Sequence, residues 1–386
     1  MRRALLFSIV LSGCAASSAT ALDSAVMAYD RTTVHLISKL LLLNIARAHR
    51  DLPTHFTTVS SIAATYDFRF NAGVGPAATG DFGWLPMPSI GGSTGENPTI
   101  TITPMQGDEF TQRLLTPFDE RKVTMLLRQG YDVDALLRLM TEQIAVREGD
   151  KTIAADNRPA NKEGYTLFRR LVAHLSSIQD RHALHVDALA MQLPRTIPAG
   201  ASEDLHAVAD DPSLTYDPDK QVYRVNARVV GRVIVCNYDP ETLAADARIA
   251  LQEEARRLAA SEILVDVRAD HPGGEYPIHG VIRLRSFMNV LTFLGRDIAA
   301  EPEYDVAPDP RTKAISENPT HTLDILEATG APSGSDLHVA LDGKIYALAP
   351  EQGYQWNKKV FSLLYQLFQM SVAPATQPSP LITIAK

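Results

Sequence analysis

A change of hydrophobic period in the first quarter of the chain constrains its fold more than any other feature. From Asp23 to Arg50, apolar residues recur at helical spacing and form a broad stripe, which predicts a long helix buried on one side. The sequence Asp51-Leu52-Pro53 ends this helix. From Ile62 to Phe70, apolar and polar residues then alternate, as they do on a half-buried strand. The fold must therefore join a long helix to an extended segment with two different faces.

A second alternating segment, Thr99–Thr103, suggests that the extended segment belongs to a hairpin. The intervening residues 71–98 are rich in Gly and Pro, so we expect them to form an elaborate loop at the hairpin tip. A loop of this length is uncommon unless it has a function. It carries an apolar cluster that is a candidate contact with a partner or a membrane, although such residues also fold back onto their own domain: Phe82, Trp84, Leu85 and Met87.

The remaining pattern predicts a mixed α+β and α/β chain of two domains. Short helices are expected at Asp108–Leu115, at Asp119–Gln129 and from Asp132 through Ile144. Residues 146–163 are polar and lack periodicity, which favours a domain boundary there. The first domain, 23–145, would then contain the long helix, the β-hairpin and the short helices.

The second domain, 164–372, reads as α/β because helical and strand patterns alternate along it. Helices are expected at 165–178, 246–259, 286–298 and 356–370, with a strand at 263–267 and a strand pair around Gly231. Asp342-Gly343, between two apolar runs, is typical of a β-hairpin turn. The Pro-containing tail, 373–386, is expected to be loose.

The N-terminus has the layout of an export signal. A basic start is followed by the apolar run Ala4–Ser12, which is too short to span a bilayer. Leu11-Ser12-Gly13-Cys14 is similar to the lipobox of bacterial lipoproteins, in which the cysteine is acylated and becomes the first residue. We therefore expect a signal peptide at 1–13, lipid on Cys14 and a tether at 14–22. Ordinary cleavage after Ala19-Thr20-Ala21, which would release a soluble periplasmic protein, is the alternative.

Two further observations bear on location and partners. By resemblance to enterobacterial sorting, Ala15 after the cysteine implies the outer membrane. The chain carries 37 basic and 45 acidic residues, a formal net charge of −8. That balance argues against nucleic-acid binding and against polybasic attachment to anionic lipid.

No catalytic or cofactor-binding motif in the sequence is complete, and we expect no cofactor and no metal. Cys236 lies in an apolar run, which favours a small buried hydrophobe over a nucleophile. Gly91–Gly95 matches the hydrolase pattern G-x-S-x-G, but a strand follows where the motif needs a helix.

Two clusters combine histidines and carboxylates, which are common zinc ligands. The first follows a predicted strand and contains Asp270, His271, Glu275 and His279. Its intervening Gly and Pro residues prevent one helix from aligning these side chains, so a solvated turn is favoured. The second contains Asp180, His182, His185 and Asp187, and lacks the spacing that places two ligands on one helical face.

Four stretches carry a family resemblance: Leu41–Ile62, Pro98–Pro117, Ile282–Ile298 and Val360–Met370. They resemble an uncharacterised family of predicted envelope lipoproteins from Gram-negative bacteria. The resemblance implies an envelope lipoprotein and supplies no catalytic residue.

These observations favour a non-enzymatic scaffold or assembly factor, anchored to the outer membrane and facing the periplasm, with an envelope protein or its own copies as partner. One alternative is a subunit of an oligomeric export channel, formed through the hairpin at 59–103. It rests on one face of the first strand, which carries Ala64, Tyr66, Phe68 and Phe70. A second alternative, a metal-dependent hydrolase, needs His271, Glu275 and His279 to converge in a pocket.

Overall fold

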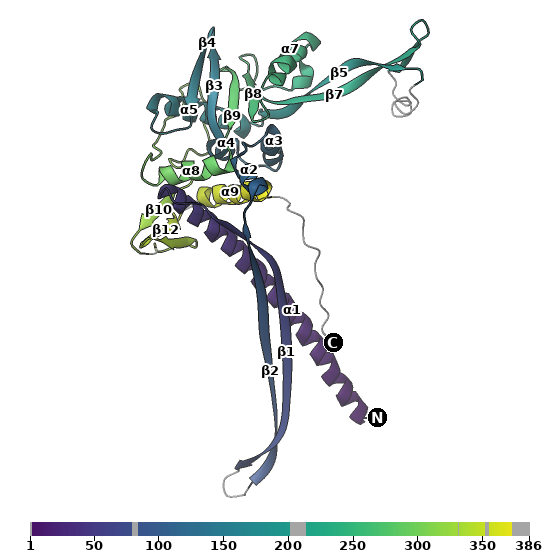
Figure 1. Ribbon diagram of the computed structural model, residues 1–386, viewed down its shortest axis with the longest axis vertical. Helices are drawn as coiled ribbons and strands as arrows, with labels where there is room; N and C mark the ends of the chain where they lie inside the picture. The colour runs from purple at the N-terminus through teal and green to yellow at the C-terminus, as the bar shows by residue number, and fades with distance from the viewer. Residues whose placement is uncertain (1, 79–83, 201–213, 331, 352–354, 373–386) are drawn as a thin grey trace. The chain divides into compact units, whose positions relative to one another are not determined.

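A computed structural model describes residues 2–78, 84–200, 214–330, 332–351 and 355–372 (Figure 1). The chain divides into two compact units. The hairpin unit comprises Met1–Leu42 and Thr54–Gly107, and the core unit comprises Leu43–Pro53 and Asp108–Lys386. Helices and strands are mixed as expected, with a long N-terminal helix, a β-hairpin and a C-terminal α/β region. The expected loose tail, 373–386, lies outside the described residues.

The hairpin unit contains most of α1 (Arg2–His49) and a two-stranded antiparallel sheet of β1 (Phe56–Ala78) and β2 (Trp84–Met105). The register runs from Phe56↔Met105 to Ala78↔Trp84, with one bulge between Val59 and Ser61. The expectation of a long loop at 71–98 is therefore wrong, because strand pairing continues through most of these residues.

The register explains how a Pro-rich segment can remain in a ladder. The pairs Pro76↔Pro86, Val74↔Pro88 and Ala64↔Pro98 all belong to the same alternate set of positions along the hairpin. In an antiparallel pair, every second residue directs its N–H away from the partner strand. Because proline has no N–H to donate, prolines placed only in that set remove no hydrogen bond of the ladder.

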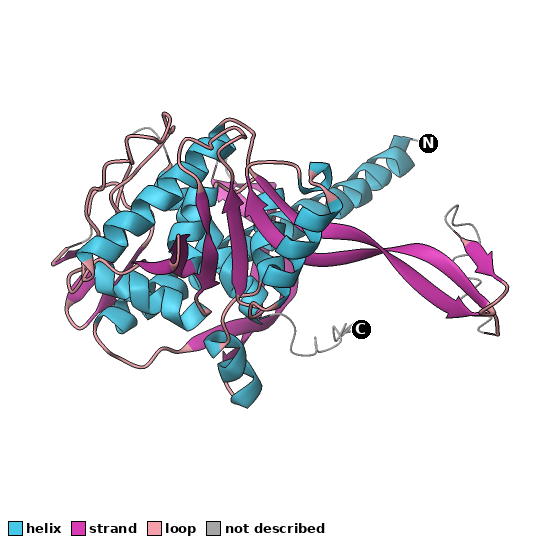
Figure 2. Cartoon of the chain, turned by 90° about the horizontal axis from the view of Figure 1, so that it is seen from above, coloured by secondary structure: helices cyan, strands magenta, loops and turns pink. Residues whose placement is uncertain are grey.

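The core unit is built around a mixed sheet of seven strands in the order β4-β3-β9-β8-β7-β5, with β6 also paired to β7 (Figure 2). All neighbours are antiparallel except β7 and β8. The strands are β3 (Thr141–Glu148), β4 (Lys151–Asp156), β5 (His185–Pro198), β6 (Thr215–Asp217), β7 (Val222–Cys236), β8 (Glu262–Val267) and β9 (Ile278–Leu284). Only the end of β7 pairs with β8, so the outer parts of β5 and β7 extend as a ribbon beyond their neighbours (Figure 2).

A smaller three-stranded sheet has the order β10-β12-β11. Its strands are β10 (Ile325–Ala328), β11 (His338–Leu341) and β12 (Lys344–Leu348). Asp342 and Gly343 connect β11 to β12 with φ values of 51° and 76°, the backbone that a tight hairpin turn requires. The hairpin predicted at this position is confirmed.

The helices of the core unit begin and end close to their predicted positions. They are α2 (Asp108–Leu115), α3 (Glu120–Arg128), α4 (Val133–Met140), α5 (Lys162–Asp180), α7 (Ala245–Arg256), α8 (Phe287–Asp297), α9 (Trp356–Val372) and the short 3₁₀ helix η2 (Pro240–Thr242). Side chains of Asp119, Asn161 and Ser286 accept hydrogen bonds from backbone N–H groups in the first turns of α3, α5 and α8.

The structure places the domain boundary differently from the sequence-based prediction. The helix expected to reach Ile144 ends at Met140, and Thr141 begins β3. Ile144 is buried in that strand, which pairs with both β4 and β9, so sheet pairing outweighs the helical spacing. Residues 146–163 therefore contain the connection between β3 and β4 within the core unit. Residues 108–145 belong to this unit and not to a domain with the β1–β2 hairpin.

Gly231 does not separate two strands, because β7 runs without interruption from Val222 to Cys236. A Cβ atom at Gly231 would lie 2.0 Å from Oε1 of Gln252 on α7. The backbone N–H of Arg232 also approaches that oxygen, at 3.3 Å. The atoms that this Cβ would meet belong to the end of the Gln252 side chain, so Gly231 marks the place where Gln252 of α7 reaches the strand and not a turn.

The interface between α7 and the sheet contains a buried apolar cluster: Leu189, Ile234, Cys236, Tyr238, Leu251, Ala255 and Leu264. These residues come from β5, β7, β8, α7 and the segment after β7, so the cluster holds α7 against this part of the sheet. Among the described helices, none is both long enough and apolar enough to cross a membrane.

Candidate functional site

The predicted lipidation site and partner contact fall in the hairpin unit. Cys14 lies within α1, and its side chain lies outside the described part of the chain. Phe82 also lies outside the described residues. Trp84, Leu85 and Met87 lie in β2, so the expectation of a loop is wrong for these three, and their contact with a partner or a membrane stays a prediction.

The register of β1 and β2 divides the hairpin residues into two sets. Register partners share a face of an antiparallel pair, and successive residues alternate between faces. One face carries Tyr66, Phe68, Phe70, Ala72 and Val74, with their partners Glu96, Thr94, Gly92, Ile90 and Pro88. The other carries Thr65, Asp67, Arg69, Asn71 and Gly73, with their partners Asn97, Gly95, Ser93, Gly91 and Ser89. The first face is therefore mainly apolar, and the second is mainly polar.

Both outer edges of this hairpin are unpaired among the described strands. An unpaired edge presents backbone N–H and C=O groups to any further strand. On β2, Pro86, Pro88, Pro98 and Pro104 interrupt the outward row of N–H groups, so the longer stretches free of proline are Ser89–Asn97 and Thr99–Thr103. Uninterrupted edge pairing through β2 is thus confined to these two stretches.

The three residues of the metal-dependent hydrolase hypothesis do not converge. Nδ1 of His279 lies 3.0 Å from Asp266, and its Nε2 lies 3.2 Å from Glu254. Glu275 instead forms ion pairs with Arg181 and Lys313.

The ring of His271 packs beside that of Tyr238, with 5.1 Å between the ring centroids. The hydrogen bond to Asp266 raises the pKa of His279, which favours the imidazolium form. An imidazolium has no lone pair for a metal ion. The three residues that the metal-dependent hydrolase alternative needs therefore do not form one site.

The remaining sequence candidates also have structural explanations. Asp187 approaches Arg128 at 3.3 Å, whereas Asp180 accepts hydrogen bonds from Ser316, so these two carboxylates have separate partners. Burial raises the pKa of the Cys236 thiol to about 12, which keeps it protonated and unreactive. The G-x-S-x-G match, Gly91–Gly95, lies within β2 and lacks the strand–turn–helix geometry of a nucleophile.

A carboxylate–histidine group that the sequence analysis missed lies at the C-terminal end of α8. Among the described residues, Asp297, Glu303 and His321 form the one group of three with potential ligand atoms within 4.8 Å of one another. Glu303 lies 3.5 Å from Arg138 and 4.0 Å from Arg169.

Burial acts to raise the pKa of Glu303, but these two arginines outweigh it and hold the pKa below its ordinary value. His321 donates to Asp297, and this bond raises the pKa of the imidazole. Because Glu303 is paired with arginines and Asp297 with His321, the group is a structural network that joins α4, α5 and α8.

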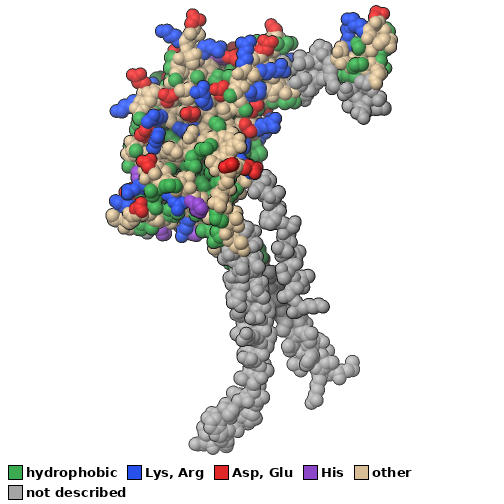
Figure 3. All heavy atoms as spheres, viewed as in Figure 1, with side chains coloured by type: hydrophobic (Ala, Val, Ile, Leu, Met, Phe, Trp, Pro, Cys, Tyr) green, Lys and Arg blue, Asp and Glu red, His purple; other side chains and the backbone are tan. Residues whose placement is uncertain are grey.

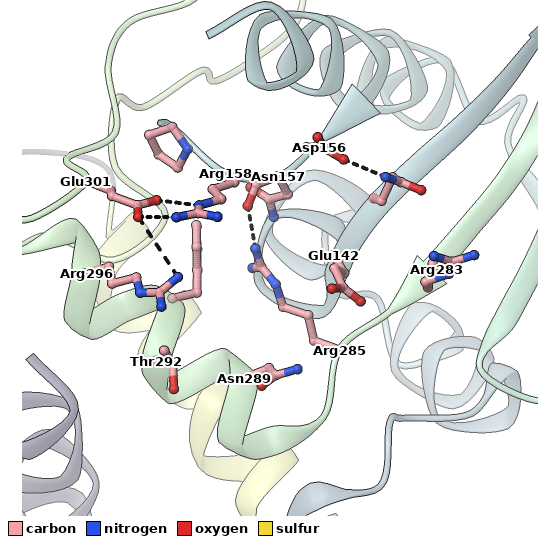
Figure 4. A pocket seen from close by; sticks show the side chains of 13 residues that line it. Glu142, Asp156, Asn157, Arg158, Arg283, Arg285, Asn289, Thr292, Arg296 and Glu301 are labelled. Atoms are coloured by element: carbon pink, nitrogen blue, oxygen red, sulfur yellow. Dashed lines mark hydrogen bonds and ion pairs between the residues drawn. The ribbon is translucent and has the colours of Figure 1, made fainter. Parts of the chain in front are cut away.

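A polar pocket of about 410 Å³ opens between the β3–β4 hairpin, the end of β9 and α8 (Figure 4). Arg158 donates two hydrogen bonds to Glu301, of 2.9 and 2.8 Å, and Arg296 approaches the same carboxylate at 4.0 Å. On the opposite side, Asp156 accepts from Gln143. These charges are therefore already paired within the wall of the pocket.

Arg285 is different because its guanidinium is buried without a carboxylate partner. Its side chain is 6% exposed, and Nη2 donates to the backbone carbonyl of Asn157. The guanidinium carbon lies 3.9 Å from the ring centroid of Phe293, and Nη1 has no hydrogen-bond partner. Burial lowers the pKa of Arg285 to about 10, so the group is still a cation at neutral pH. This site could not be predicted from the sequence, because its walls come from segments far apart in the chain.

On the face of the core unit shown in Figure 3, acidic and basic side chains are interspersed and do not gather into a basic patch. No protein-family model, curated protein or solved structure matches the chain at a significant level.

Proposed function

We propose that the protein is a lipid-anchored envelope protein whose β1–β2 hairpins associate with one another in a membrane and form the wall of an oligomeric channel. The observation that carries this proposal is the register of the hairpin, which separates apolar from polar residues between Thr65 and Val74; nearer the tip, where Gly75 pairs with Met87 and Ala77 with Leu85, both faces are apolar. Strands that cross a bilayer show this alternation, with apolar residues toward lipid and polar residues toward water.

The apolar face has a suitable length. From Phe68 to Ala78 on β1, and from Trp84 to Thr94 on β2, the positions of this face carry no charged residue. A tilted membrane-spanning strand needs roughly 9–11 residues. The one acidic residue of the mainly apolar set, Glu96, lies beyond this span and pairs with Tyr66.

The free edges of the hairpin explain why assembly is required. In hydrocarbon, each backbone group without a hydrogen-bond partner costs several kcal/mol, so a lone two-stranded sheet is unstable there. If β1 of one copy pairs with β2 of the next, a closed ring of hairpins satisfies the edge groups of Ser89–Asn97, and Pro86 and Pro88 have no N–H group that would need a partner. Lipid on Cys14 would hold the copies on one membrane and raise their local concentration.

The sharpest experiment uses two neighbouring residues on opposite faces, Phe70 and Asn71. The full-length protein is extracted in mild detergent, its mass is measured by analytical ultracentrifugation, and its conductance is recorded in planar bilayers. Phe70→Arg places a charge on the face toward lipid, at a cost of about 2–4 kcal/mol near the midplane, and should abolish both the large complex and the conductance.

Asn71→Arg is the matched control, because the same charge would face water. It should preserve the complex and shift its selectivity toward anions. A wild-type protein that remains monomeric at every concentration contradicts the proposal, and so does equal loss of assembly in the two variants. A non-enzymatic scaffold would have the same lipid anchor. It would not, however, predict different behaviour of the Phe70→Arg and Asn71→Arg variants.

A further inference from the structure

The pocket around Arg285 belongs to the core unit and has no part in the proposed hairpin assembly. Its distinguishing feature is a buried arginine with an unused donor, Nη1, at the wall of a cavity of about 410 Å³. A desolvated cation is costly unless an opposite charge and further hydrogen bonds compensate it. Within the protein, Arg285 has one carbonyl acceptor and one aromatic ring.

The other charges of the pocket do not supply the missing compensation. Arg158 and Arg296 share Glu301, and Arg283 lies 3.2 Å from Glu262. Two carboxylates, Glu303 and then Glu142, act on Arg285 through space, but neither forms an ion pair with it, and Glu142 is exposed (Figure 4). The pocket therefore contains a buried guanidinium that has no carboxylate in direct contact among the described side chains.

The rest of the lining favours a ligand with hydroxyl groups. Asn289 and Thr292 lie one turn apart on α8 and both line the pocket. The Thr292 hydroxyl donates to Met288, which leaves its oxygen free to accept. The side-chain oxygen of Asn157 is buried and has no donor, although its nitrogen donates to two backbone carbonyls. Hydroxyl groups, which both donate and accept, complement such a mixed wall.

We propose that this pocket binds an oxyanion, a phosphate or a carboxylate, carried on a small polyhydroxylated molecule of sugar size, with Arg285 as the anion-binding residue. Arginine suits this role because its planar donors match the oxygens of both groups. The volume lies within the range of small-molecule sites, about 300–1,000 Å³, and exceeds what a bare ion needs.

Calorimetric titration of the full-length protein in detergent tests the ligand class. The probes are inorganic phosphate, glucose 6-phosphate, glucuronate and glucose. Saturable binding is expected for glucose 6-phosphate or glucuronate, and the tighter of the two identifies phosphate or carboxylate as the preferred group. Glucose should not bind. The proposal fails if neither sugar anion binds at about 10 mM in low salt, or if inorganic phosphate binds as tightly as both.

Variants with opposite expected effects test the site itself. Arg285→Lys keeps the charge but loses the planar donors, and should weaken binding by about tenfold or more. Glu142→Gln removes the competing carboxylate and should strengthen binding severalfold. Glu148→Gln is the matched control, since it is exposed on the same strand, outside the pocket, and should leave affinity unchanged.

If Arg285→Lys does not fold, the affinity of the Glu142→Gln variant tests the site by itself, because Glu142 is exposed. Equal affinity in wild type and Glu142→Gln, or equal gains in the Glu142 and Glu148 variants, would overturn the proposed site. These measurements do not depend on oligomer formation, so their failure is distinguishable from failure of the channel proposal.

Discussion

Nδ1 of His49, in the last turn of α1, lies 3.0 Å from the carbonyl oxygen of Gly295 on α8. A Cβ atom at Gly295 would lie 2.7 Å from the His49 backbone nitrogen and 3.0 Å from the carbonyl oxygen of Ile45. The end of α1 and helix α8 thus meet backbone to backbone within the core unit. Ile45 and Ala46 are fully buried at this contact.

Gly295→Val should destabilise the core unit by about 1–3 kcal/mol, because the added atoms meet backbone and cannot be accommodated by a side-chain rotation. Urea unfolding followed by circular dichroism measures the change. Gly200→Ala is the control, since a Cβ atom there meets nothing within 4 Å and should shift stability by no more than about 0.5 kcal/mol. Wild-type stability in Gly295→Val would contradict the close approach.

Breaking the buried ion network should cause a large loss of stability, and a second substitution should restore part of it. Arg138→Met should cost about 3–5 kcal/mol, because it leaves Glu303 buried with one arginine fewer to compensate it. Adding Glu303→Gln should recover part of that loss, and a double-mutant cycle measures the coupling. Lys359→Gln, which removes an exposed ion pair to Asp132, should cost about 0–1 kcal/mol. Additive effects of the two buried substitutions would argue against the network.

The raised pKa of His321 predicts that the free energy of unfolding depends on pH. Its hydrogen bond to Asp297 raises its pKa above the ordinary value of 6.5, so the folded state binds the proton more tightly than the unfolded state. This contribution is fully present below pH 6.5 and is lost as the pH rises through the higher folded-state pKa. His321→Asn should therefore reduce the free energy of unfolding more at about pH 6 than at about pH 9. A loss of equal size at both values would show that the imidazolium form contributes nothing.

The proposed lipid anchor predicts a change of cell fraction. Cys14→Ala removes the proposed acceptor of the lipid, so the protein should move from the membrane to the soluble periplasmic fraction on immunoblots. Cys236→Ala is the control, because that thiol is buried within the core and its loss should leave the protein membrane-bound. Tight membrane association of Cys14→Ala would instead point to attachment through another segment.

Local signals predicted the elements whose partners are close in sequence. The helix Asp108–Leu115 and the turn at Asp342-Gly343 were predictable because propensity and turn chemistry decide them. The strand structure of residues 71–98 and of Ile144 could not be predicted from their own pattern, because pairing with a distant strand determines it. In the pocket, Asn157 and Arg285 meet from positions 128 residues apart, which no spacing in the sequence reveals.

The prolines at 76, 86, 88 and 98 also bear on how the chain avoids amyloid. A long hairpin with an apolar face and open edges is a template on which identical chains can stack without limit. A fibril requires an uninterrupted row of donors along each added strand, and proline breaks that row. On β2 the interruptions leave Ser89–Asn97, a stretch rich in Gly and polar residues where fibrillar side-chain packing is poor, and the short segment Thr99–Thr103. The prolines that shorten the contact available between copies through β2 therefore also act as gatekeepers against irreversible aggregation along that strand.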